Sequence, residues 1–83
     1  MPITLEQAKN LKHGDILYAD DDFNVDGTKR RHRVVGKVKT WKRNLDRIKV
    51  PLKYGLYACG ELTNGTWEGN QYTLNLDMVS LEE

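Results

Sequence analysis

Eleven of the thirteen lysine and arginine side chains lie between Lys29 and Lys53, and that window contains a single acidic residue, Asp46. The window carries a net charge of +10, whereas residues 1–28 carry −4 and residues 54–83 carry −5. The total of +1 hides this segregation, which creates a local positive field. Such a field attracts polyanions, so the window is the first candidate for a binding surface.

Strand geometry would place these charges on one face. Side chains two apart in a strand point to the same side, and we expect residues 31–43 and 47–54 to form two strands. If residues 44–46 form the turn between them, their basic faces are contiguous. Cations neutralise phosphates and aromatic rings stack on bases, which predicts a site for a DNA or RNA backbone. The candidate residues are Arg31, Arg33, Lys37, Lys39, Trp41, Arg43, Arg47, Lys49 and Lys53.

A second interpretation of the basic window needs no ligand. The lysine and arginine stems would cover a small core while their charged ends stay in water. Acidic side chains could also fold back over the strip and neutralise it, the candidates being Asp20, Asp21, Asp22, Glu61 and Glu68. A β-bulge at Gly36 would shift the alternation and scatter the strip.

The residues that could bind a metal do not form a convincing set. Residues 22–27 match the opening of an EF-hand calcium loop, but the twelfth position, which needs a bidentate Glu, is Arg33. We expect a turn there, in which Asp side chains bond the local backbone. Cys59 is the only cysteine and fits a small core residue, so we expect neither a disulfide nor a metal or other cofactor.

No group of residues predicts a reaction. The sequence has no nucleophile elbow, phosphate loop, paired-carboxylate motif or His-rich metal spacing. We therefore expect a protein that is not an enzyme.

The first element expected to support the basic window is a short helix over residues 4–13. Thr4 is a good N-cap, Gln7 completes a capping box, and Gly14 supplies the stop. A helix of this length does not persist alone, so it must dock on a sheet.

Short strands and tight turns account for the remainder. Further strands are expected over residues 15–19, 56–63, 71–76 and 77–81. An acidic loop covers residues 20–28 and closes at Asp26-Gly27, and Asn64-Gly65 marks a second tight turn. About five antiparallel strands with one N-terminal helix predict a small, mostly β barrel, a single domain over residues 1–83.

The aromatic residues outside the window fit the interior of this barrel. Trp67 would plug one end of it, whereas an exposed Trp67 would favour a contact surface. Tyr54, Tyr57 and Tyr72 are expected to be partly buried with their hydroxyl groups at the rim, and Tyr54 or Tyr57 would border the basic strip.

The ends and the hydropathy of the chain bear on its location. The N-terminus has neither a basic leader nor an apolar core, and no apolar run approaches the ~18 residues of a membrane span. We expect no membrane partner and a cytoplasmic location, and a virus-encoded protein acting in its host would look the same.

Two resemblances extend these expectations. Residues 11–18, with Gly14-Asp15 at the start of a strand, resemble the first strand of small Src-homology-3-type barrels. The whole chain, and residues 36–43 and 50–57 above all, looks like small uncharacterised proteins of tailed phages and marine viral metagenomes. The first resemblance implies a five-stranded antiparallel barrel of a type that binds nucleic acids or peptides. The second implies a phage-type protein of the host cytoplasm and assigns no activity.

Two functions therefore stay open. One is a small accessory protein that binds a nucleic-acid backbone through the basic strip, with Trp41 stacking or wedging and with weak sequence preference. The other is a protein-interaction module that modulates a host or phage protein, or that associates with itself through its separated acidic and basic regions. An exposed Trp41 favours the first function and a buried Trp41 weakens it.

Overall fold

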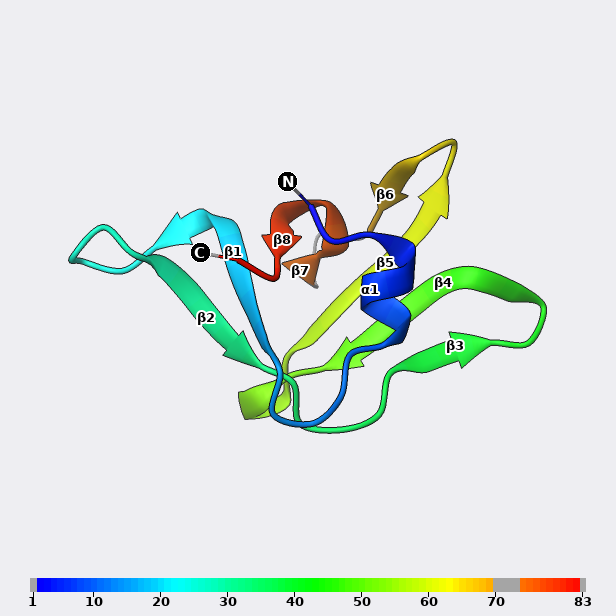
Figure 1. The fold of residues 1–83 in the computed structure, drawn as a ribbon, viewed down its shortest axis with the longest axis horizontal. Coiled ribbons are helices and arrows are strands. Elements are labelled where there is room, and N and C mark those ends of the chain that lie inside the picture. Colours follow the sequence, from blue (N-terminus) through cyan, green and yellow to red (C-terminus); the bar gives the residue numbers. More distant parts are fainter. Residues whose placement is uncertain (1, 70–73, 83) are drawn as a thin grey trace.

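The protein is mostly β, with one short helix. The computed structural model describes residues 2–69 and 74–82. Its elements, labelled in Figure 1 except for the one-turn 3-10 helices η1 and η2, are α1 (Leu5–Lys9), β1 (Ile16–Phe23), β2 (Lys29–Arg33), β3 (Lys39–Trp41), β4 (Asn44–Pro51), η1 (Lys53–Gly55), β5 (Tyr57–Thr63), β6 (Thr66–Glu68), β7 (Leu74–Asn75), η2 (Leu76–Met78) and β8 (Val79–Ser80).

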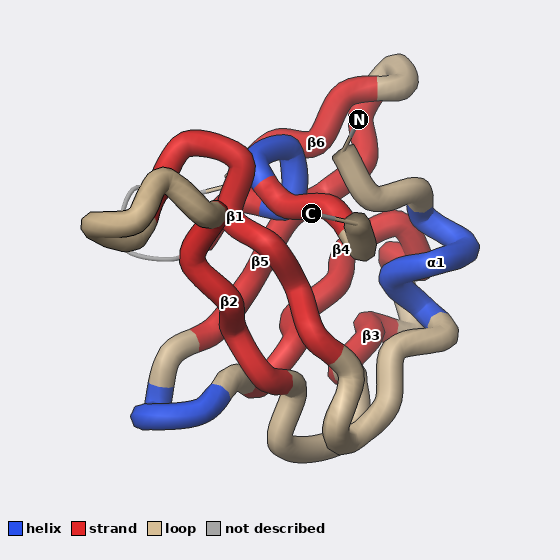
Figure 2. The backbone as a smooth tube through the Cα atoms, turned by 60° about the vertical axis from the view of Figure 1, so that its left-hand side comes forward, coloured by secondary structure: helices blue, strands red, loops and turns tan. Residues whose placement is uncertain are grey.

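The strands form two sheets that share one core, and Figure 2 shows the β1–β2 pair crossing in front of β4 and β5. One sheet has the order β2-β1-β8, and the larger sheet has the order β3-β4-β5-β6, with β7 pairing parallel to β5. A bridge between Val34 and Leu52 joins them. The predicted mostly β fold with an N-terminal helix is confirmed. The sheets stay open in the described part of the chain, so the closed five-stranded barrel is not confirmed.

The predicted single strand over residues 31–43 is wrong, because the chain leaves one sheet and enters the other within it. β2 and β3 belong to different sheets. Between them, a Cβ atom on Gly36 would lie 3.2 Å from the Cγ atom of Pro51, and the Val35 N–H donates to the Pro51 carbonyl oxygen at 3.0 Å. The close approach to Pro51 fixes a bend at Gly36, so the alternation of the basic window is interrupted there.

The predicted turn at residues 44–46 is also wrong, since Lys42-Arg43 forms the turn and Asn44 already begins β4. The Asn44 side chain is engaged elsewhere. Its amide donates to the Glu61 carboxylate on β5, and its Oδ1 atom accepts from the Asp46 backbone N–H at 3.2 Å. The asparagine that signalled a turn instead fastens the start of β4 to β5.

Two other turns are where the sequence placed them. The predicted loop over residues 20–28 is wrong in its first part, because β1 continues through Phe23. The Asp26-Gly27 turn is confirmed: Gly27 has a φ of 88°, and the Asp26 carboxylate accepts from the Thr28 N–H at 3.0 Å. Asn64-Gly65 is confirmed as the two-residue link between β5 and β6, with φ values of 52° and 80°.

The helix begins as predicted and ends early. Thr4 and Gln7 form both hydrogen bonds of the capping box, but α1 stops at Lys9 rather than near residue 13. Gly14 lies beyond the helix, where its φ of 97° lets its N–H donate to the Val34 carbonyl oxygen at 2.8 Å. No helix in residues 2–69 and 74–82 has the length and apolar character that crossing a bilayer requires.

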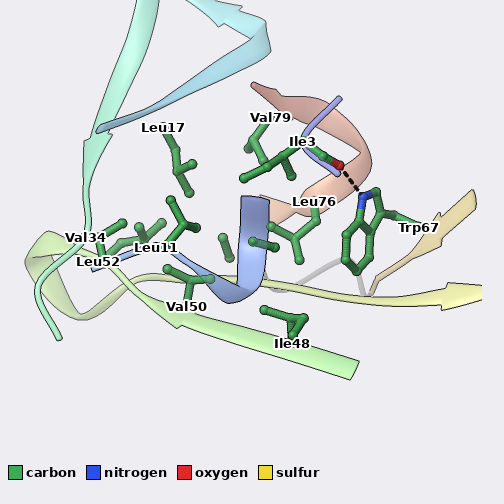
Figure 3. Packing of buried hydrophobic residues seen from close by; sticks show 12 residues of the cluster. Ile3, Leu11, Leu17, Val34, Ile48, Val50, Leu52, Trp67, Leu76 and Val79 are labelled. Carbon is green, nitrogen blue, oxygen red and sulfur yellow. Dashed lines mark hydrogen bonds between the residues drawn. The ribbon is translucent and has the colours of Figure 1, made fainter. Parts of the chain in front are cut away.

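The core lies between the two sheets and α1 (Figure 3). The alternation predicted for β4 is confirmed, since Ile48, Val50 and Leu52 are all buried. Trp67 is 5% exposed, and its Nε1–H donates to the Ile3 carbonyl oxygen at 2.7 Å, as Figure 3 shows. Trp67 is therefore a core residue and no contact surface, and it fastens the N-terminal segment to β6.

The last predicted strands are only partly described. Residues 71–73, and with them Tyr72, lie outside the described residues. From the predicted strand over residues 71–76, only Leu74–Asn75 is seen as a strand, while Leu76 opens η2. The strand expected over residues 77–81 is the two-residue β8, which pairs with β1.

Candidate nucleic-acid interface

The outer face of the larger sheet collects cations because β4 alternates. Ile48 and Val50 point into the core, so Arg47 and Lys49 point outward. The β3–β4 register places Lys39 directly opposite Lys49. Three cations from two neighbouring strands thus share one exposed face.

Two aromatic rings lie among these cations. The Arg47 guanidinium carbon lies 4.4 Å from the centroid of the half-buried Trp41 ring, and the Lys39 Nζ atom lies 5.3 Å from it. The Lys49 Nζ atom lies 4.2 Å from the centroid of the Tyr57 ring, which is 41% exposed. Contacts of this kind hold a cation over a ring. We call Lys39, Trp41, Arg47, Lys49 and Tyr57 the cationic face.

A shallow groove of about 510 Å³ runs across this face onto β5 and β6. Its walls change sign from one side to the other: Arg47 and Lys49 lie on β4, whereas Glu61 lies on β5 and Glu68 on β6. The groove is lined by Trp41, Arg47, Ile48, Lys49, Tyr57, Cys59, Gly60, Glu61, Glu68 and Gly69.

Like charges oppose each other across two of the three neighbouring strand pairs in the order β3-β4-β5-β6. Lys39 faces Lys49 between β3 and β4, and Glu61 faces Glu68 between β5 and β6. Like charges directly opposite on a sheet are destabilising. Between β4 and β5 the charges are opposite, since Arg47 faces Glu61. The outer face of the larger sheet therefore carries a repulsive basic pair and a repulsive acidic pair, with an oppositely charged pair between them.

The acidic run at Asp20–Asp22 neutralises a different part of the basic window. Asp20 pairs with Lys29 at 2.9 Å, and Asp22 pairs with Arg30 at 2.9 Å, both on the β1–β2 hairpin. Within residues 2–69 and 74–82, the cations of the cationic face form no ion pair with a carboxylate. The neutralisation that the sequence left open is thus seen at Lys29 and Arg30, at the start of β2.

The ionised state of Asp20 follows from its contacts. Partial burial raises the pKa of Asp20, but hydrogen bonds from Lys29 and Ser80 outweigh burial and bring the pKa below its ordinary value of 3.8. The Asp20 carboxylate is therefore ionised at neutral pH, and its contacts with Lys29 and Ser80 tie β1, β2 and β8 together.

The structure brings four of the nine predicted site residues onto the cationic face, namely Lys39, Trp41, Arg47 and Lys49. Lys53 lies beyond the end of β4, with its Nζ atom 5.2 Å from the Tyr54 ring centroid. The predicted continuous strip is wrong because its supporting strand is broken. The four residues left outside are Arg31 and Arg33 on β2, Lys37 in the connection to β3 and Arg43 in the β3–β4 turn.

Two expectations for β5 and its neighbours are corrected. Cys59 is half-buried in the groove and is no core residue, because Ala58 and Gly60 are the residues of β5 that point inward. Tyr54 is 86% exposed and Tyr57 41% exposed, so neither is part of the core. The inward Ala58 and Gly60 alternate with outward Tyr57 and Cys59, a period of two that the sequence carries and that would have placed Tyr57 on the site.

The EF-hand-like segment forms a turn. The Asp26 carboxylate accepts from the Thr28 hydroxyl at 2.6 Å as well as from its N–H, and Asp22 is paired with Arg30. The prediction that the Asp26 side chain hydrogen-bonds the local backbone is confirmed. In residues 2–69 and 74–82, no three His, Cys, Asp or Glu side chains are grouped so that they could hold a metal ion.

Comparison with known proteins finds no relative of this chain. No protein-family model matches the chain, and no curated protein and no solved structure matches it. A function must therefore be inferred from the charges, rings and grooves themselves.

Proposed function

We propose that this protein is a small accessory protein without enzyme activity that binds the backbone of a nucleic acid on its cationic face. The observation that carries the proposal is the pair Lys39 and Lys49, which face each other with Arg47 beside them and no ion-paired carboxylate among the described residues. An anion placed among them would turn a repulsive arrangement into an attractive one.

The repulsion between the Lys39 and Lys49 ammonium groups is small. Side chains directly opposite in a sheet have Cβ atoms about 5 Å apart. Two charges held at about 7 Å repel by roughly 0.6 kcal/mol in water. Contacts with Trp41 and Tyr57 keep Lys39 and Lys49 near the sheet, so the charged groups are already ordered before a phosphate arrives. Ordering before binding lowers the entropy cost of association.

The rings give this face a preference for nucleic acid over other polyanions. Tyr57 offers an exposed ring beside Lys49, and bases stack on such rings whatever their sequence. Trp41 is half-buried, and both Arg47 and Lys39 lie over its ring, so a base that stacks on Trp41 would displace a cation. We expect tolerance of sequence, because these contacts read phosphates and ring faces.

Fluorescence anisotropy with labelled single- and double-stranded DNA and RNA tests the proposal. With three phosphates neutralised, affinity should fall roughly 20-fold for single strands and roughly 40-fold for B-DNA between ~50 and ~200 mM salt. Lys49→Gln should weaken binding to every sequence and flatten the salt dependence. Arg30→Gln is the matched control, because Arg30 is paired with Asp22 on the other sheet. Binding that is absent at low salt, or flat with salt, would refute the proposal.

Cys59 provides a second readout on the same groove. It is the only cysteine of the chain and lies half-buried beside Lys49, its register partner. A bound oligonucleotide should slow its modification by a thiol reagent. Unchanged modification under saturating oligonucleotide would mean that binding occurs elsewhere.

A protein-interaction module is the second candidate, and the acidic wall of the groove favours it. Glu61 and Glu68 oppose the cations across one face, so a partner or a second copy with the reverse pattern would satisfy both pairs. Sedimentation at increasing concentration tests self-association, which Glu68→Gln and added salt should both weaken. A monomer at every concentration, with no partner retained from a host lysate, would exclude this candidate.

The origin and the fold family are proposals as well. We propose a phage-type protein that works in the cytoplasm of its host, with a fold derived from Src-homology-3-type barrels. What suggests the fold relationship is the resemblance of residues 11–18, with Gly14-Asp15 before β1, to the first strand of such barrels. A phage genome that encodes this chain beside genes of nucleic-acid metabolism would support the origin.

A further inference from the structure

A second groove, of about 470 Å³, lies between the end of α1 and the connection from β2 to β3. It is lined by Lys9, Leu11, Lys12, His13, Gly36, Lys37 and Val38. Three of these residues are lysines, one is a histidine and none is acidic. Leu11 is buried and Val38 is half-buried against the core, so the groove combines a cationic rim with an apolar floor.

Two segments that are far apart in the sequence build this groove. After α1, the Asp15 carboxylate accepts from the Lys12 N–H at 3.0 Å and closes a tight turn. The Gly14 N–H in this turn donates to the Val34 carbonyl oxygen and fixes the turn beside the β2–β3 connection. In Figure 1 the two segments run together along the lower edge of the molecule. The groove is therefore held by hydrogen bonds that backbone N–H groups donate, one to the Asp15 carboxylate and one to the Val34 carbonyl oxygen, and not by its lysine side chains.

Lys37 and Lys39 connect this groove to the cationic face. They flank Val38, which packs against the core, and both are exposed. Residues two apart have Cα atoms at most about 7 Å from each other. Among residues 2–69 and 74–82, β3 is an edge strand of its sheet, so no other strand of this part of the chain separates the cationic face from the second groove there. Cations thus follow one another from Lys49 and Lys39 to Lys37 and the rim of the second groove.

We infer that the second groove takes the continuation of a single-stranded nucleic acid whose first part lies on the cationic face. This inference rests on the proposed function and specifies its ligand. Lys9, Lys12 and Lys37 contact phosphates, while an unpaired base lies on the floor formed by Leu11 and Val38. A duplex cannot place a base there, because its bases are stacked and paired inside the helix.

The two grooves make a quantitative prediction for strand length. A short strand that covers only the cationic face meets three cations, Lys39, Arg47 and Lys49, and its affinity should fall roughly 20-fold between ~50 and ~200 mM salt. A longer strand that also meets Lys9, Lys12 and Lys37 neutralises six phosphates. Its affinity should fall roughly 300-fold over the same range.

The experiment measures the salt dependence of binding for oligothymidylates of ~4 and ~12 nucleotides and for a 12-base-pair duplex. In the double variant Lys9→Gln/Lys12→Gln, the salt dependence of the long strand should drop to roughly 50-fold, and that of the short strand should stay the same. Lys9→Arg/Lys12→Arg keeps the charge and should keep the wild-type slope. Arg30→Gln removes a cation outside both grooves and should leave the salt dependence of both strands unchanged.

Each outcome decides between defined alternatives. Two results would overturn binding in the second groove while leaving the cationic face in place. One is an equal salt dependence for the short and long strands, and the other is a long strand whose salt dependence is unchanged in Lys9→Gln/Lys12→Gln. A duplex that binds as tightly as the long single strand would overturn the single-stranded ligand. If neither oligonucleotide binds at ~50 mM salt, the proposed function itself fails. Circular dichroism of each variant verifies that the fold is retained.

Discussion

Gly60→Ala should destabilise the protein, because the space beside Gly60 is already filled. A Cβ atom at this position would lie 3.0 Å from the Trp67 Cε3 atom and 3.2 Å from the Leu76 Cβ atom. Neither neighbour can move easily. Trp67 is fixed on its other side by the hydrogen bond to the Ile3 carbonyl oxygen, and Leu76 is fully buried.

The magnitude follows from two opposing terms. Forcing an extra methyl group into a packed core costs about 1–3 kcal/mol. Replacing glycine by alanine restricts the unfolded chain and returns about 0.4–1 kcal/mol. Gly60 has no positive φ, so backbone strain adds nothing. The free energy of unfolding should fall by about 1.5 kcal/mol, which lowers Tm by roughly 6–12 °C in a domain of this size.

Urea and thermal unfolding, followed by tryptophan fluorescence and circular dichroism, measure this change. Trp67→Leu removes the ring atom that the new methyl group would meet. Gly60→Ala should therefore cost about 1 kcal/mol less in the Trp67→Leu background than in the wild type. A Gly60→Ala protein as stable as the wild type, or strictly additive costs in the double variant, would refute the packing argument.

Three further predictions concern local features. Thr4→Ala removes the capping box of α1 and should lower the free energy of unfolding by about 1 kcal/mol, measured by urea titration. Gly65→Ala forces alanine to a φ of 80° and should cost about 1 kcal/mol, whereas Asn64→Gly in the same turn should be nearly neutral, as two Tm values would show. Burial lowers the pKa of His32 below its ordinary value of 6.5, an effect that nearby Asp22 only partly offsets, so the folded state favours the neutral ring. This stabilisation is present above pH 6.5 and is lost as the pH falls through the lower folded-state pKa, so the loss of stability on acidification from pH 7 to pH 5 should be smaller in His32→Gln.

Features decided by near neighbours in the chain could be predicted. The capping box of Thr4 and Gln7, the Asn64-Gly65 turn and the alternation of Ile48 and Val50 all depend on residues within a few positions. The same alternation placed Arg47 and Lys49 correctly on an outer face. The charge segregation is likewise a property of the sequence, and it led to the region in which the cationic face lies.

The composition of the site depended on contacts that the sequence does not display. Gly36 packs beside Pro51, near the other end of the basic window, at the bend where the chain passes between the sheets, and Arg31 and Arg33 lie on the smaller sheet. Asn44 bonds Glu61 and so moves the β3–β4 turn. The Gly36–Pro51 approach joins residues 15 positions apart in the chain, and the Asn44–Glu61 hydrogen bond joins residues 17 positions apart.

The sequence by itself determined the start of the N-terminal helix, the alternation of β4, two tight turns and the sign of the charge in each third of the chain. Only the tertiary structure decided which cations share a face, and only the tertiary structure forms the groove beside Lys9 and Lys37. The physical reason is how far apart in the chain the interacting residues lie. Caps, turns and alternation are set by hydrogen bonds and sterics within a few residues, whereas the partner of each strand is chosen by burial of the whole core.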